Sequence, residues 1–273
     1  MKLEFTKMEG LGNDYVYVDV DRLPLTDPEV LVLREEGGLS RLCDRHFGIG
    51  ADGLVLIGRS PRADFSMRMF NADGSEGMMC GNAARCIAKY VFDNGLTDKR
   101  ELTLDTPAGI KRLSLSVGAD GLVDKVSVDM GKARIVQRNL ILEAAGASFT
   151  GTVVDVGNPH FVIFCDDAEA IDLPTIGPAI ERHPLFPGRI NVEFSSLNDG
   201  SSLRMRVWER GSGITLACGT GASASVAAAL DAGIVSCPCE VITDGGKLLF
   251  TVEAGNILMT GPARTVFSGT VEI

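Results

Sequence analysis

A strand-like segment followed by a Cys-Gly turn occurs twice in this sequence, 138 residues apart. Met67-Arg-Met-Phe precedes Cys80, Met205-Arg-Val-Trp precedes Cys218, and in both places glycine follows the cysteine and a helical pattern begins. A Gly-Asn segment before further strands also recurs, at Asn13 and 145 residues later. Because cysteine is rare, this shared register predicts two similar domains. A repeat of this length indicates a domain duplication and not a solenoid.

The rest of the chain reads as short strands with a few helices. The two helical patterns of the repeat, 82–93 and 219–232, end at Gly95 and Gly233, where a left-handed residue is preferred. Further helices are expected over 27–36, 39–46 and 172–182. We expect Arg204 and Arg206, which alternate on a strand, to be solvated. Alternating or apolar runs predict strands over 15–20, 54–57, 65–70, 113–117, 126–130, 161–164, 190–194, 203–208, 248–252 and 257–260.

Composition narrows the class of protein. The chain has 273 residues and a formal net charge of −10. A bulk field of that sign repels phosphate backbones, so we expect no nucleic-acid partner. Its seven cysteines have no regular spacing, which is typical of free thiols in a reducing compartment. The first residues lack an apolar signal region, and the least polar stretch, 216–235, is a poor membrane span, so we expect a cytoplasmic protein without a membrane partner.

The repeated Cys-Gly turn suggests a chemistry. The first turn of a helix carries free N–H groups and the positive end of the dipole, which bind a carboxylate and stabilise a thiolate. Pseudo-two-fold symmetry would place Cys80 and Cys218 opposite each other in an interdomain cleft. One thiolate would then remove the α-proton of an amino acid and the other thiol would protonate the opposite face, without a cofactor. Two adjacent thiols would rest as one thiolate and one thiol.

Other motifs carry less chemistry. A lone buried cysteine is usually structural, and we assign that role to Cys43, Cys86, Cys165, Cys237 and Cys239. The segment 48–53 matches G-x-G-x-x-G, but a strand pattern follows it where a dinucleotide site needs a helix, so we reject it. Three separated histidines and a tight Cys237-Pro-Cys pair do not suggest a metal site.

The sequence resembles the diaminopimelate epimerase family from residue 3 to about 225. The resemblance implies the two-cysteine mechanism, with neither pyridoxal phosphate nor another cofactor, and an α+β fold of two similar, pseudo-symmetric domains, each a β-barrel-like sheet around a central helix. The motifs occur in the family order: Phe5-Thr-Lys-Met-Glu-Gly-Leu-Gly-Asn-Asp, Asp44-Arg-His-Phe-Gly-Ile-Gly-Ala-Asp-Gly, Phe70-Asn-Ala-Asp-Gly-Ser-Glu, Met79-Cys-Gly-Asn-Ala-Ala-Arg-Cys, Gly157-Asn-Pro-His, Ile190-Asn-Val-Glu-Phe, Trp208-Glu-Arg-Gly-Ser-Gly and Ala217-Cys-Gly-Thr-Gly.

The same resemblance implies roles for individual residues. Cys80 and Cys218 match the catalytic thiols, and His160 and Glu209 match residues that tune the thiol pKa values. Without the resemblance, the asparagines would read as turn residues and His160 as a satisfied, partly buried histidine. Residues that match the backbone donors to the α-carboxylate are Gly81, Asn82, Gly219 and Thr220, and those that match side chains around the substrate are Asn13, Asn71, Asn158, Asn191, Glu209 and Arg210.

Three positions depart from the family pattern. Ala83 and Ile214 stand where glycine and glutamate are frequent, and Gly53 stands where some members have a glutamine that contacts substrate. None removes a group that the mechanism needs, although Gly53 leaves the contacts of the α-amino group open.

The sequence therefore predicts an isomerase that interconverts LL- and meso-2,6-diaminopimelate, in the pathway to lysine and peptidoglycan precursors. The alternatives are a racemase of another amino acid on the same scaffold, or a thiol–disulfide redox protein. We expect domains at 1–120 and 121–263, with the strand 264–273 returning to the first. The resemblance also favours a homodimer.

Overall fold

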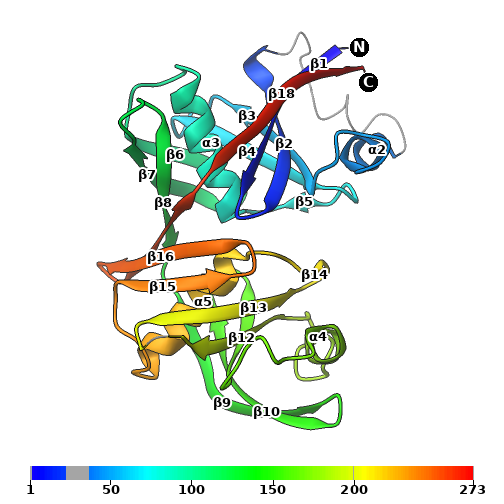
Figure 1. The fold of residues 1–273 in the computed structure, drawn as a ribbon, viewed down its shortest axis with the longest axis vertical. Helices are drawn as coiled ribbons and strands as arrows, with labels where there is room; N and C mark the ends of the chain where they lie inside the picture. The colour runs from blue at the N-terminus through cyan, green and yellow to red at the C-terminus, as the bar shows by residue number, and fades with distance from the viewer. Residues whose placement is uncertain (1, 23–36, 199, 273) are drawn as a thin grey trace. The chain divides into compact units, whose positions relative to one another are not determined.

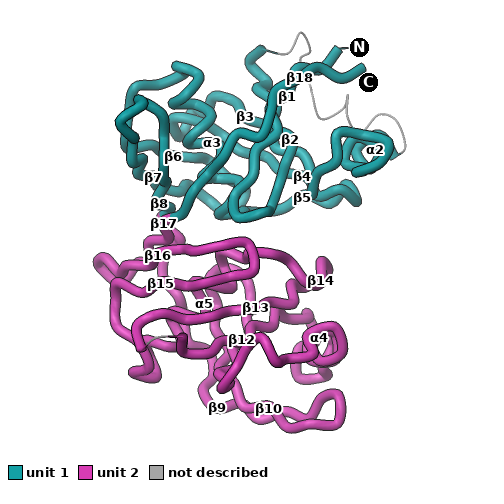
Figure 2. Tube along the Cα trace, in the orientation of Figure 1, with its two compact units in different colours: residues 1–128, 261–273 teal, residues 129–260 magenta. Residues whose placement is uncertain are grey.

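The computed structural model describes residues 2–22, 37–198 and 200–272, so the expected helix over 27–36 lies outside the described residues. The chain divides into two compact units (Figure 2). Unit 1 comprises Met1–Val128 together with Gly261–Ile273, and unit 2 comprises Asp129–Thr260.

Unit 1 is built from antiparallel and parallel strands around one long helix (Figure 1). Strand β1 pairs with β2 and with the C-terminal strand β18, so the two ends of the chain share one sheet. From β2 the sheet continues through β3 and β4 to β6 and β7. The elements are β1 Lys2–Gly10, β2 Asn13–Asp19, η1 Val20–Arg22, α2 Gly38–Cys43, β3 Gly53–Gly58, β4 Phe65–Asn71, β5 Glu76–Gly77, α3 Gly81–Asp93, β6 Glu101–Thr106, β7 Gly109–Val117, β8 Val123–Gly131 and β18 Arg264–Glu272.

Unit 2 repeats this plan. Strand β10 pairs with β9 and β11, and the sheet continues through β12 and β13 to β15 and β16. The helices α4 and α5 belong to this unit. The elements are β9 Arg134–Ala144, β10 Ala147–Asp155, β11 Pro159–Phe164, α4 Leu173–Glu181, β12 Asn191–Leu197, β13 Ser202–Glu209, β14 Gly213–Ile214, α5 Gly219–Asp231, β15 Cys239–Thr243, β16 Gly246–Glu253 and β17 Asn256–Pro262, of which the last two residues belong to unit 1.

The strand registers confirm the internal repeat. In unit 1 Leu54 of β3 pairs with Phe70 of β4, and in unit 2 the residues 138 positions later, Val192 and Trp208, pair in the same way. The parallel pairs β2–β3 and β11–β12 also correspond. In each unit, the strand at the Gly-Asn segment (β2 or β11) pairs with the first strand of the antiparallel pair just described (β3 or β12). The expected α+β fold of two similar halves is therefore correct.

The central strands are buried on both faces. Strand β3 is apolar throughout, and its Leu54 and Leu56 pack with Leu39 and Leu42 of α2. In β11, Phe161 packs in the cluster that includes α4, while Val162 points to the other face and packs with Ala224 and Ala228 of α5. Side chains alternate across a strand, so a strand covered by a helix on each face reads as one apolar run.

Helices α3 and α5 have the same start and the same end. Each is 13 residues long and begins after a cysteine in extended conformation. Gly95 and Gly233 both have a φ of 69°. At each end the amide of the residue after this glycine bonds to a carbonyl five residues back, Leu96 N–H to Val91 and Ile234 N–H to Ala229, which is the Schellman arrangement. The expected glycine stops are confirmed.

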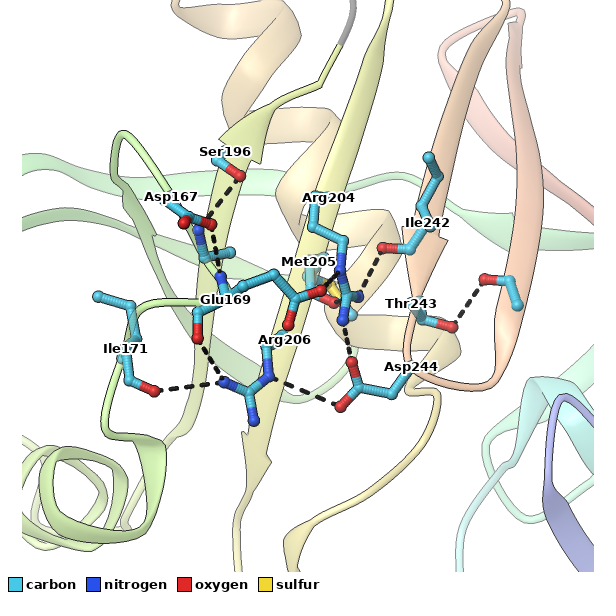
Figure 3. A network of polar contacts seen from close by, with 12 residues as sticks. Asp167, Glu169, Ile171, Ser196, Arg204, Met205, Arg206, Ile242, Thr243 and Asp244 are labelled. Carbon is cyan, nitrogen blue, oxygen red and sulfur yellow. Dashed lines mark hydrogen bonds and ion pairs between the residues drawn. The ribbon is translucent and has the colours of Figure 1, made fainter.

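The expectation that Arg204 and Arg206 are solvated is wrong. Their side chains are only 13% and 18% exposed, because Glu169 and Asp244 lie over this face of the sheet and bind the guanidinium groups (Figure 3). Arg204 also donates to the carbonyl of Ile242 on the neighbouring strand β15, at 3.0 Å. Charged side chains on a strand here serve as cross-links between segments.

Other expectations are settled locally. The G-x-G-x-x-G match at 48–53 runs into strand β3 and does not open a helix, as predicted. The expected helices at 39–46 and 172–182 appear as α2 and α4. In the described part of the chain, no helix is long and apolar enough to cross a bilayer.

Candidate active site

Cys80 is the N-cap of helix α3. Its sulfur accepts a hydrogen bond from the Ala83 amide at 3.5 Å, so it faces the open N–H groups of the first turn. The sulfur also donates to Asn13 Oδ1, 3.5 Å away. A helix start places partial positive charge at a thiol and at any anion beside it. The local geometry that the sequence predicts at Cys80 is present.

A chain of amides links Cys80 to charged groups behind it. Asn13 Oδ1 accepts from Asn82 Nδ2 at 3.3 Å, and Asn13 Nδ2 donates to Asp52 Oδ2 at 2.8 Å. The buried Arg85 donates to Asn82 Oδ1 at 2.8 Å. Since guanidinium only donates and an ionised carboxylate only accepts, both ends fix the same orientation of the two amides. The predicted residues Asn13, Cys80, Gly81 and Asn82 therefore lie together.

Cys218 is the N-cap of helix α5 in the same geometry. Its sulfur accepts from the Gly221 amide at 3.4 Å, and Thr220 Oγ1 lies 3.4 Å from it. Asn158 Nδ2 donates to the same Thr220 hydroxyl oxygen at 3.4 Å. Because Asn158 already donates to this oxygen, the Thr220 hydroxyl can donate its own hydrogen to the sulfur.

Behind Asn158 lies a fully buried histidine–carboxylate pair. His160 Nε2 is 3.0 Å from Asn158 Oδ1, and His160 Nδ1 is 2.6 Å from Glu193 Oε1. Each ring nitrogen of His160 therefore faces a hydrogen-bond acceptor, the carboxylate at Nδ1 and the amide oxygen at Nε2. His160 and Glu193 are both 0% exposed. A single hydrogen-bonded chain therefore runs from Glu193 to the Cys218 sulfur.

The environment of Cys218 disfavours its anion. Burial raises the pKa of the Cys218 thiol well above its ordinary value of 9.0, and the carboxylates of Glu209 and Glu193 add to that shift. Burial likewise raises the pKa of Glu209, whose carboxylate accepts a hydrogen bond from Thr215. At Cys218, loss of water and two acidic neighbours therefore act against the stabilisation that a helix start gives a thiolate.

The remaining substrate-binding candidates have defined local roles. Asn191 donates to the Pro159 carbonyl at 2.9 Å and accepts from the Arg210 amide at 2.9 Å, so it joins β12 to the β11 start and to the loop after β13. Arg210 is exposed and donates once to the Gly188 carbonyl, at 3.3 Å. Asn71 bonds to Ser75 at 3.0 Å within a turn.

The three departures from the family pattern have structural correlates. A Cβ at Gly53 would lie 2.1 Å from the Phe70 carbonyl oxygen, so this backbone excludes any side chain there. Ala83 is fully buried on α3. Ile214 is 42% exposed on β14, so no acidic group projects from that position.

The other five thiols are outside these two clusters. Burial raises the pKa of Cys43 to about 11 and that of Cys86 to about 12, which makes both poor nucleophiles. All seven cysteines are free. Among the residues that the structure describes, no group of three His, Cys, Asp or Glu side chains could hold a metal ion.

Sequence reasoning missed three polar residues that hold the clusters in place: Asp52, Arg85 and Glu193. A signal existed for Glu193, which interrupts an apolar strand pattern at a position where the repeat has Val55. Arg85 likewise corresponds to Ser223 in the repeat. Differences between the two halves at matched buried positions were the available clue.

Comparisons with known proteins identify the family of this chain. The diaminopimelate epimerase family model matches residues 5–136 and 152–266. A diaminopimelate epimerase of Phocaeicola vulgatus is 51% identical over 284 residues, covering 99% of each chain, and that of Bacteroides thetaiotaomicron is 51% identical over 273 residues, covering 99% of this chain and 98% of its own.

Solved structures share the fold at low sequence identity. A hydroxyproline epimerase from Agrobacterium vitis superposes with a TM-score of 0.73 at 17% identity, over 99% of this chain and 92% of its own. A phenazine biosynthesis protein of the PhzF family from Bacillus anthracis gives a TM-score of 0.75 at 16% identity, over the whole of both chains. By the extent and identity of these sequence matches, this chain belongs to the diaminopimelate epimerase family.

Proposed function

We propose that this protein interconverts LL- and meso-2,6-diaminopimelate by proton transfer at one α-carbon. The observation that carries the proposal is the duplicated cysteine N-cap: two helices of equal length, each with a thiol that accepts a hydrogen bond from its own first turn. The choice of diaminopimelate as the substrate rests on membership of the diaminopimelate epimerase family.

In the proposed reaction, Cys80 and Cys218 are the two bases. One thiolate removes the α-proton, and the other thiol protonates the opposite face, so the centre inverts and the thiol and thiolate exchange roles. The raised pKa of Cys218 favours its thiol form at rest. The amides of Gly81, Asn82, Gly219 and Thr220 would bind the α-carboxylate and stabilise the charge that grows on it, because they belong to helix starts. The chemistry proposed for this chain requires no cofactor.

Side chains near the helix starts would bind the rest of the substrate. The exposed guanidinium of Arg210 has donors beyond the one bound to Gly188, and a planar fork suits a second carboxylate. We propose that Asn13, Asn71, Asn158, Asn191 and Glu209 contact the amino groups and carboxylates, and that His160 acts through Asn158. Arg210→Lys then weakens binding of diaminopimelate more than it slows bound turnover.

Deuterium exchange tests the proposal. LL-diaminopimelate incubated with the protein in D₂O is expected to gain deuterium at the α-carbon as meso product forms. Cys80→Ala and Cys218→Ala should each slow epimerisation by at least about 10²-fold, the usual loss for a proton-transfer group. Cys165→Ser is the matched control, because Cys165 lies outside both clusters and should leave turnover unchanged. Turnover that survives both alanine variants would falsify the mechanism.

Substrate class is tested separately. A panel of proline, glutamate and histidine should show no racemisation under conditions in which diaminopimelate turns over. If the protein racemises one of these three amino acids, the assignment moves to a racemase of that amino acid on the same scaffold.

We also propose a cytoplasmic location and a homodimer. Seven free cysteines suit a reducing compartment, and the homodimer rests on the family resemblance. Cell fractionation and sedimentation equilibrium measure the two properties directly.

A further inference from the structure

Glu193 is a buried acid whose side chain contacts His160. It lies on β12 at 0% exposure, with Oε1 2.6 Å from His160 Nδ1. Within the described residues, its Oε2 has no hydrogen-bond partner. Burial of a carboxylate is costly even when it is paired, and an apolar residue of similar size is often as stable in its place. Packing alone therefore does not explain this side chain.

The first turn of helix α5 is shaped around this carboxylate. A Cβ on Gly221 would lie 2.7 Å from Glu193 Oε1 and 3.2 Å from its Cγ, so only glycine fits there. At the matched positions of the repeat, unit 1 has Val55 and Ala83. The half without the acid thus tolerates a side chain on the helix, and the half with the acid does not.

A chain of three residues connects Glu193 to the Cys218 sulfur. Its contact with Nδ1 holds the His160 ring so that Nε2 faces Asn158 Oδ1. That contact turns the Asn158 amide so that its Nδ2 donates to Thr220 Oγ1. The Thr220 hydrogen is then directed to the Cys218 sulfur, 3.4 Å from Oγ1.

We propose that Glu193 is a positioning residue of the Cys218 half-site, which holds His160, Asn158 and Thr220 so that a hydroxyl donor always meets the Cys218 sulfur. The proposal rests on the proposed function, since the donor stabilises the thiolate that forms when Cys218 gives its proton to the substrate. A hydrogen bond to a charged acceptor is stronger than one to a neutral acceptor, so its effect is greatest at that stage.

The charged groups around Cys218 determine which variants the test needs. Glu209 from β13 and Glu193 from β12 both raise the pKa of the thiol, and Thr220 lowers it. His160 from β11 faces the two carboxylates. Any substitution of Glu193 therefore removes one negative charge as well as the contact to His160, and two substitutions are needed to separate these effects.

Glu193→Gln and Glu193→Val provide that separation. Both remove the charge, but only glutamine keeps a polar group that can hydrogen-bond to Nδ1 and hold the His160 ring in place. The measurement is the pH dependence of iodoacetamide alkylation at Cys218, read by peptide mass spectrometry with Cys80 as internal reference. At one pH below the alkylation midpoint, Cys218 in Glu193→Val should react about tenfold more slowly than in Glu193→Gln, the loss expected for one hydrogen bond to a thiolate. Cys80 should react equally in both.

A double variant separates positioning from packing. Glu193→Val with Gly221→Ala rebuilds the arrangement of Val55 and Ala83, so its thermal midpoint should recover relative to Glu193→Val alone. Its kcat and its Cys218 alkylation profile should stay as in Glu193→Val. Ser195→Ala, which removes another buried polar group of β12 that bonds to Ser225, is the matched control and should leave the Cys218 profile unchanged.

Three results overturn the proposal: equal Cys218 alkylation profiles in the valine and glutamine variants, recovery of kcat in the double variant, or the same profile shift in Ser195→Ala. Alkylation needs no turnover, so the test reads independently of whether diaminopimelate is the substrate. Loss of epimerisation in the parent protein would refute the proposed function and leave these outcomes readable.

Discussion

Replacement of the buried Arg85 by methionine should destabilise unit 1 strongly. Arg85 is 0% exposed on helix α3. Its Nε donates to the Pro262 carbonyl at 3.0 Å and its Nη2 to Asn82 Oδ1 at 2.8 Å. Methionine keeps the apolar stem but supplies no donor, so both oxygens lose a donor inside the protein.

The magnitude follows from those two acceptors. Each buried group left unsatisfied costs about 1–3 kcal/mol, which gives about 2–6 kcal/mol in total. Relief of the guanidinium's own desolvation offsets part of this, and we expect a net loss of about 3 kcal/mol. With a urea m-value of about 2 kcal/mol/M, the midpoint falls by about 1.5 M. Arg85→Lys keeps the charge but not the planar set of donors, so its urea midpoint should lie between those of the parent and of Arg85→Met.

Urea unfolding followed by far-UV circular dichroism measures this loss. The matched control is Ser223→Ala, at the same helix position 138 residues later, where only a bond from Oγ to the Gly219 carbonyl at 2.7 Å is lost. That variant should cost no more than about 1 kcal/mol. The reasoning fails if Arg85→Met unfolds within about 1 kcal/mol of the parent, or no earlier than Ser223→Ala.

Three further perturbations test other parts of the structure. Gly95→Ala and Gly233→Ala should each cost about 1 kcal/mol and lower the thermal midpoint equally, because both positions have a φ of 69°; unequal costs would contradict the shared cap geometry. Lys99 and Thr103 lower the pKa of Asp64 from its ordinary value of 3.8 to about 2, so its stabilising effect is present above about pH 4 and disappears as the pH falls through 2. Asp64→Asn should flatten that acid limb of a stability–pH curve, and an unchanged limb would refute the assignment. Arg204→Met should cost about 1–2 kcal/mol in chemical unfolding through its lost bonds to Ile242, Glu169 and Asp244; a cost near zero would mean that the network is no stronger than an exposed ion pair.

The parts of the fold with local signals could be predicted from the sequence. The cysteine N-caps, the glycine stops and the apolar strands of the repeat depend on residues within a few positions of one another. Strands β9 and β10 were not expected, because Arg134–Ala144 is largely exposed and its alternation is broken by charged and amide residues. No periodic burial pattern marks such a strand before its partner is known.

The parts of the site that depend on distant contacts could not be predicted. Thiol position followed from the repeat, but the pKa of Cys218 depends on Glu193 and Glu209, which come from two other strands. The Arg204 network is similar, since Asp244 and Glu169 lie 40 and 35 residues away in sequence. Burial and charge pairing between separate elements are properties of the folded chain, and they cannot be read from a single sequence.

The pairing of β18 with β1 affects when unit 1 can be completed during synthesis on the ribosome. Unit 2 is one continuous stretch, so all of it is translated before the strand β18. Unit 1 needs Gly261–Ile273 to complete its sheet, and until then β1 exposes an edge along which Thr6 to Glu9 and their neighbours have backbone groups without their β18 partners. Strand β1 is therefore translated long before the strand that completes its edge, which leaves an unpaired edge exposed during synthesis.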